Sequence, residues 1–129
     1  MRPVLRLVPV LVALALATAA EGCGDGASPV GTLHVAVTTD PAAPMIGRNT
    51  FHVEVTSAAG EPLDAAVTVT PWMPAHGHGS TESPTVTAAG KGRFTAFPVT
   101  LFMAGDWQVT ARAEQGGEFG ELVLRYSLQ

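Results

Sequence analysis

The fold is decided by residues 51–70, FHVEVTSAAGEPLDAAVTVT, in which two alternating segments lie on either side of a turn. Apolar residues occupy every second position of 51–55, and the same period of two returns after the turn at 58–62. Successive side chains of a β-strand point to opposite faces of its sheet. The stretch therefore predicts strands that each bury one face, interrupted by a turn rich in Gly and Pro.

The same alternation continues outward in both directions. Upstream, it covers 33–38. Downstream, it covers a short segment at 85–87 and longer ones at 93–102 and 107–111. In the last segment, three residues are expected to face one way: Leu122, Leu124 and Tyr126. Proline cannot donate a ladder hydrogen bond, so Pro98 predicts a bend or an edge position within 93–102.

About seven strands in roughly a hundred residues, without a convincing helix, indicate an all-β domain. The prediction is an immunoglobulin-like antiparallel β-sandwich of about seven strands that follows an N-terminal signal peptide. A small barrel remains an alternative.

The N-terminal residues predict export. Two arginines in the first six residues precede a short apolar run, and small residues lead to the only cysteine, Cys23. The segment Ala20-Glu21-Gly22-Cys23 resembles the cleavage site of a bacterial lipoprotein, and lipidation would cap a thiol that is otherwise exposed to oxidation. A plain secretory signal with a free Cys23 is the alternative.

These features divide the chain into three parts. Residues 1–22 are expected to be a lipoprotein signal peptide, 23–31 a flexible tether rich in small residues, and 32–129 the sandwich domain. The expected location is the cell envelope, with the protein lipid-anchored on the periplasmic side or at the outer membrane.

The charge balance excludes one class of partner. The whole chain has a formal charge of −4, and removal of residues 1–22 leaves five basic and ten acidic residues, a charge of −5. Nucleic-acid binding needs a basic patch, and the sequence has none, so no nucleic-acid partner is expected.

Catalysis is not expected either. Ser80 lies near His76, His78 and Glu82 in the sequence, but four neighbours on a glycine-rich loop do not supply a rigid triad and its oxyanion pocket. The chain is therefore expected not to be an enzyme.

Metal binding is the stronger hypothesis, and it rests on residues 71–80, PWMPAHGHGS. Imidazole is a common ligand of copper and zinc, and thioether sulfur favours Cu(I). Met73, His76 and His78 are the candidate ligands, and the glycine at position 77 lets the backbone fold so that both rings can reach one ion. The alternative is a solvated turn that is merely rich in histidine.

Three further side chains bear on this hypothesis. Met103 begins a turn that can meet the 71–80 loop at one end of a sandwich, although a methionine there can also simply fill the core. Trp72 can cover a bound cation with its ring or serve as packing. His34 and His52 fall on outward positions and are expected to be ordinary surface histidines.

These motifs together resemble the YtkA-like domain family. The resemblance covers about residues 32–127 and is carried by WMPAHGH at 72–78, GRF at 92–94 and FMAGDWQV at 102–109. It implies an exported or membrane-tethered β-sandwich with a role in copper handling, and its motif falls on Met73, His76, His78 and Met103 together with Gly105 and Trp107. The family is related to FixH, a factor associated with cbb3-type oxidase assembly.

The resulting interpretation is an exported, lipid-anchored protein that binds copper, as Cu(I), and acts as a copper chaperone or metal-handling factor. Its expected partners are the metal ion, another metalloprotein of the envelope, and the membrane through its lipid anchor. The rival is a non-catalytic immunoglobulin-like interaction module without a metal. A zinc-binding role through His76, His78 and Glu82 is the less favoured third reading.

Overall fold

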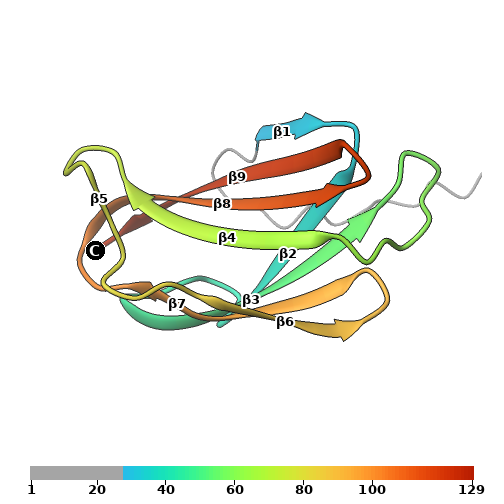
Figure 1. Ribbon diagram of the computed structural model, residues 1–129. Coiled ribbons are helices and arrows are strands. Elements are labelled where there is room, and N and C mark those ends of the chain that lie inside the picture. Colours follow the sequence, from blue (N-terminus) through green and yellow to red (C-terminus); the bar gives the residue numbers. More distant parts are fainter. Residues whose placement is uncertain (1–27) are drawn as a thin grey trace, which may run out of the picture.

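The computed structural model describes residues 28–129, which form two antiparallel sheets packed face to face (Figure 1). The described strands in chain order are β1 (Ser28–Gly31), β2 (His34–Asp40), β3 (Gly47–Thr56), β4 (Ala66–Met73), β5 (His78–Gly79), β6 (Thr85–Gly90), β7 (Arg93–Leu101), β8 (Gly105–Gln115) and β9 (Glu118–Leu128). The predictions for the signal peptide and for Cys23 lie outside the described residues.

One sheet has the strand order β1-β9-β8-β4-β5 and the other has the order β2-β3-β7-β6. Because the two sheets are separate and neither closes on itself, the predicted β-sandwich is confirmed over the barrel. Seven of the strands have six residues or more, which agrees with the predicted number. None of the residues from 28 to 129 forms a helix that could span a bilayer.

The core follows the alternation of the sequence. In β3, Phe51, Val53 and Val55 are buried while His52 and Glu54 are exposed, as the period of two predicts. Across the sandwich, the buried residues of β8 begin with Trp107, which is 1% exposed.

The structure adds two short strands to the predicted set. β1 occupies the last four residues of the segment expected to be a tether, where it pairs with β9, so these four residues belong to the five-stranded sheet. β5 comprises only His78 and Gly79, within the loop that carries the candidate ligands. Neither strand has enough residues to show a periodic pattern.

Pro98 lies in an interior strand at an irregular point. The pairing of β3 with β7 shifts between Asn49 and Phe51, so that Phe97 and Pro98 together face the single residue Thr50. The pairing of β6 with β7 extends only to Phe97. Pro98 therefore occupies a bulge and lies beyond the end of β6, which satisfies both the bend and the local edge that the proline predicts.

Candidate metal centre

The 71–80 segment forms a tight hairpin between β4 and β5. The backbone amides of His76 and Gly77 donate to the carbonyl of Met73, at 3.2 and 2.9 Å. Gly77 has a φ of 66°, a left-handed conformation that glycine adopts without steric cost. The hairpin therefore has a defined turn and is not a loose loop.

The strand register places two candidate ligands on one face. Met73 pairs directly with His78 across β4 and β5. Residues directly opposite each other in an antiparallel pair have Cβ atoms about 4.5–5.5 Å apart on the same side of the sheet. Met73 is fully buried and His78 is partly buried, so this shared face is the inner one.

The backbone orients the His78 ring. Its Nδ1 lies 3.0 Å from the carbonyl oxygen of Gly79, which can only accept a hydrogen bond, so Nδ1 is the donor and the neutral ring in this arrangement presents the lone pair of Nε2. Histidines that bind metals have this arrangement, in which the other ring nitrogen donates to a carbonyl or carboxylate. The ring of the exposed His76 lies 5.5 Å from that of His78, measured between centroids.

A second turn, which joins β7 to β8, meets this hairpin. A Cβ atom on Gly105 would lie 2.7 Å from Cε of Met73, so the thioether fits against the backbone of that turn. The His78 ring lies 5.5 Å from Phe102 and 6.5 Å from Trp107. The predicted meeting of the two loops at one end of the sandwich is confirmed.

Comparison with protein families assigns the domain that contains both loops. A family model described as YtkA-like matches residues 28–112, from the start of β1 into β8, and so includes both loops. The chain belongs to the YtkA-like family. No curated protein and no solved structure matches the chain. The match begins at Ser28, four residues before the expected domain boundary and at the first residue of β1.

Within the YtkA-like domain, Met103 lies in the second turn, directly after Phe102. Its carbonyl accepts a hydrogen bond of 3.0 Å from Nε1 of Trp107, and its partly buried side chain packs against the core. Ligation of an ion by the Met103 sulfur stays a prediction.

Trp72 lies on the other face of the hairpin. It pairs with Gly79, one position away from the Met73–His78 pair, so its ring stands on the outer face. There it is 43% exposed and would lie 3.5 Å from a Cβ on Gly79. Its position favours the packing role over the cation-capping role, and the aromatic rings beside His78 are those of Phe102 and Trp107.

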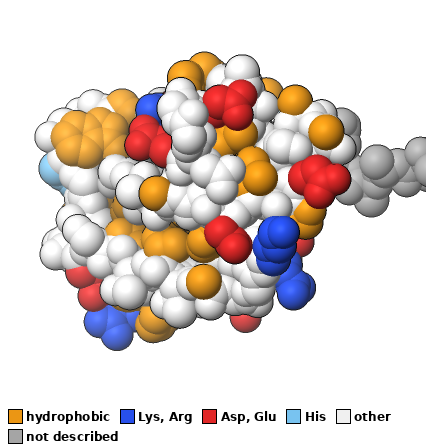
Figure 2. Space-filling view, turned by 45° about the vertical axis from the view of Figure 1, so that its right-hand side comes forward, with side chains coloured by type: hydrophobic (Ala, Val, Ile, Leu, Met, Phe, Trp, Pro, Cys, Tyr) orange, Lys and Arg blue, Asp and Glu red, His pale blue; other side chains and the backbone are white. Residues whose placement is uncertain are grey.

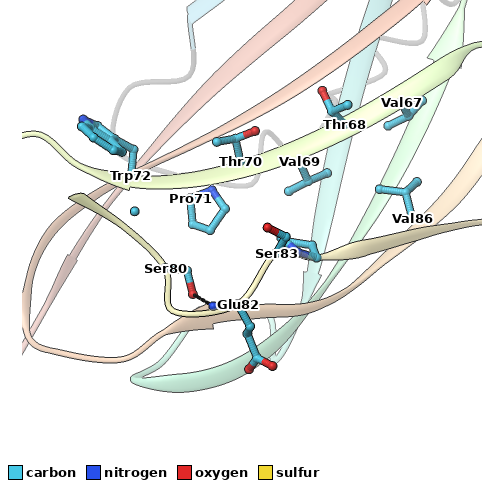
Figure 3. Close-up of a pocket in the computed structure, with 12 residues that line it drawn as sticks. Val67, Thr68, Val69, Thr70, Pro71, Trp72, Ser80, Glu82, Ser83 and Val86 are labelled. Carbon is cyan, nitrogen blue, oxygen red and sulfur yellow. Dashed lines mark hydrogen bonds between the residues drawn. The ribbon is translucent and has the colours of Figure 1, made fainter. Parts of the chain in front are cut away.

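A separate groove runs along β4 with a volume of about 610 Å³ (Figure 3). Val69 and Pro71 point toward it, whereas Thr68, Thr70 and Trp72 point away. β4 pairs with β8 on one side, but on the other it pairs with β5 only at Trp72 and Met73. Among residues 28–129, the rest of this strand edge has no partner strand.

Glu82 lines the same groove but does not join the histidines. Its carboxylate accepts hydrogen bonds from the Thr100 hydroxyl and from Arg48, which also forms a salt bridge with it at 3.1 Å. The Thr100 hydrogen bond and then the Arg48 guanidinium hold the pKa of Glu82 below its ordinary value. Among residues 28–129, no three His, Cys, Asp or Glu side chains are gathered where they could hold a metal ion, so this structure does not bring His76, His78 and Glu82 together as a zinc site.

The remaining two histidines lie away from this end. His34 and His52 are exposed on outward positions of β2 and β3, as predicted. Nδ1 of His52 lies 3.4 Å from the Thr95 hydroxyl on the neighbouring strand. His52 therefore serves as a control position for experiments on the candidate centre.

Proposed function

We propose that this YtkA-like protein is an exported copper-binding protein that acts as a copper chaperone or metal-handling factor. The proposed ligands are His78, His76 and Met73, with Met103 as a further soft ligand. The observation that carries the proposal is the Met73–His78 pair, which places a thioether and an oriented imidazole on one face of a tight hairpin.

The ligand chemistry favours Cu(I) over zinc. Thioether sulfur is a soft ligand that selects Cu(I), whereas zinc sites use thiolate, imidazole or carboxylate. Glu82, the nearest carboxylate in the sequence, is already paired with Arg48 and Thr100. An ion held by neutral ligands at a partly exposed hairpin can also be released to an acceptor, as a chaperone requires.

The proposal is tested by titrating the exported protein with Cu(I) and Zn(II) in competition with a chelator of known affinity. His76→Ala and His78→Ala are each expected to weaken Cu(I) binding by about tenfold or more, because each loses one ligand. His52→Ala is the matched control and should bind like the wild type, since it removes an exposed histidine from the other sheet. Wild-type binding no tighter than that of the double His76/His78 variant would refute the proposal.

We further propose that Cys23 carries a lipid that anchors the protein to the cell envelope. Changing Cys23 to serine should move the protein from the membrane fraction to the soluble fraction, because lipid chains hold a protein at the bilayer by about 0.8 kcal/mol per buried CH₂. Fractionation and lipid labelling of cells expressing each form measure this. An unchanged distribution of the serine variant would contradict lipid anchoring.

The proposed role is binding rather than catalysis, and no nucleic-acid partner is proposed. On the face drawn in Figure 2, acidic side chains lie next to the basic ones, and no extended basic patch forms there. The proposed macromolecular partner is another metalloprotein of the envelope that exchanges the ion.

The alternative function is an interaction module without a metal. The observation that favours it is the unpaired edge of β4 beside the groove, because an extended peptide can add to such an edge as a further strand. The copper titration separates the two functions, since a pure interaction module would show no Cu(I) binding that depends on His78.

A further inference from the structure

Phe102 is an exposed aromatic residue that contacts the candidate centre. It follows β7 directly and is 37% exposed, in contrast to the core aromatics Phe51 and Trp107, which are at most 1% exposed. One of its two aromatic neighbours is a candidate ligand, since its ring stacks on His78 with centroids 5.5 Å apart and an interplanar angle of 24°, while Trp107 meets it edge-on at the same distance. The Phe102 ring therefore packs on the His78 imidazole at the surface and is not buried in the core.

The near-parallel stack turns the face of Phe102 toward the His78 imidazole. An ion bound to Nε2 lies in the plane of the imidazole, about 2 Å from the nitrogen. Because the two rings are nearly parallel and stacked, the face of Phe102, rather than its edge, is turned toward the plane of the imidazole in which such an ion would lie. Cations are attracted to the electron-rich face of an aromatic ring within about 6 Å of its centroid.

Trp107 packs edge-on against both rings of this stack. Its ring is close to perpendicular to both neighbours, at 70° to His78 and 80° to Phe102. Its indole N–H is bonded to the carbonyl of Met103, the residue after Phe102. The buried tryptophan thus fixes the turn from which Phe102 reaches the imidazole.

We infer that Phe102 is a specificity-determining residue of the copper site, whose ring covers the ion on His78 and favours Cu(I) over Zn(II). This inference rests on the proposed function. An aromatic face attracts a soft, weakly hydrated cation but offers no lone pair and leaves less room for water. The Phe102 ring is expected to add less to the affinity for Zn(II), because Zn(II) completes its coordination with nitrogen, oxygen or thiolate ligands.

The inference is tested by measuring Cu(I) and Zn(II) affinities of the exported protein and its variants by chelator competition. Phe102→Leu should lower the Cu(I) affinity by about tenfold and leave the Zn(II) affinity within about threefold. Phe102→Trp should restore Cu(I) binding, since indole is the best cation–π partner. Phe97→Leu is the matched control, because Phe97 is also exposed, at 48%, but lies on β7 away from the hairpin.

The outcomes separate this inference from the function on which it rests. If Phe102→Leu lowers the affinities for Cu(I) and Zn(II) equally, or lowers neither, the role of Phe102 is overturned. The copper function still stands in that case, provided that the wild type binds Cu(I) and His78→Ala does not. Absence of Cu(I) binding by the wild type would overturn both. The urea midpoint of each variant, expected to be unchanged for these exposed positions, excludes unfolding as the cause.

Discussion

Replacement of Gly105 with alanine is expected to weaken Cu(I) binding by about tenfold or more and to destabilise the domain by about 2–4 kcal/mol. A Cβ at this position would lie 2.7 Å from Cε of Met73, and Met73 is fully buried, so its thioether must move within the core. The φ of Gly105 is 127°, which adds backbone strain for any other residue. Chelator competition and urea unfolding measure the two effects.

Gly47→Ala separates strain from displacement of the ligand. Gly47 has a similar φ of 114°, but a Cβ there would meet no atom within 4 Å. Both variants therefore lose stability through strain, whereas only the Gly105 variant moves the Met73 sulfur. Equal Cu(I) affinities for the two variants would show that the position of Met73 does not matter for binding.

Replacement of Trp107 with alanine should lower the free energy of unfolding by about 3–5 kcal/mol, which corresponds to a fall of about 2 M in the urea midpoint. Trp107 is 1% exposed, so its removal leaves a cavity beneath the second turn. The change also removes the hydrogen bond to the Met103 carbonyl and the edge contacts with His78 and Phe102.

The chain supplies its own control for this experiment in its second tryptophan. Trp72 is 43% exposed on the outer face of the hairpin, so Trp72→Ala should cost at most about 1 kcal/mol. Similar losses for the two variants would contradict the assignment of Trp107 to the core and Trp72 to the surface.

The sandwich could be predicted because its signal is local. Alternation such as that of Phe51, Val53 and Val55 reports which face of a strand is buried, whatever its partner is. β1 could not be predicted in this way, since Gly31 and its three neighbours form a strand only because β9 offers them an edge. β5 could not be predicted either, because two residues are too few to show a periodic pattern.

The candidate centre could be predicted in part. The spacing of Met73, His76 and His78 within one loop indicated ligands, and their hairpin brings Met73 and His78 onto one face. Sequence reasoning chose Trp72 as a possible cation cap, but alternation along β4 turns that ring outward. Phe102 was missed because its stack on His78 joins two loops distant in sequence, and no local pattern encodes that contact.

The pairing of the first described strand with the last has a consequence for the order of folding. β9, the last of the described strands, lies between β1 and β8, so the first described strand pairs with the last one. Contacts between residues so far apart in the chain form slowly, because the intervening chain must first be ordered. The five-stranded sheet therefore cannot be completed until β9, which ends at Leu128, has been synthesised and has paired with both β1 and β8.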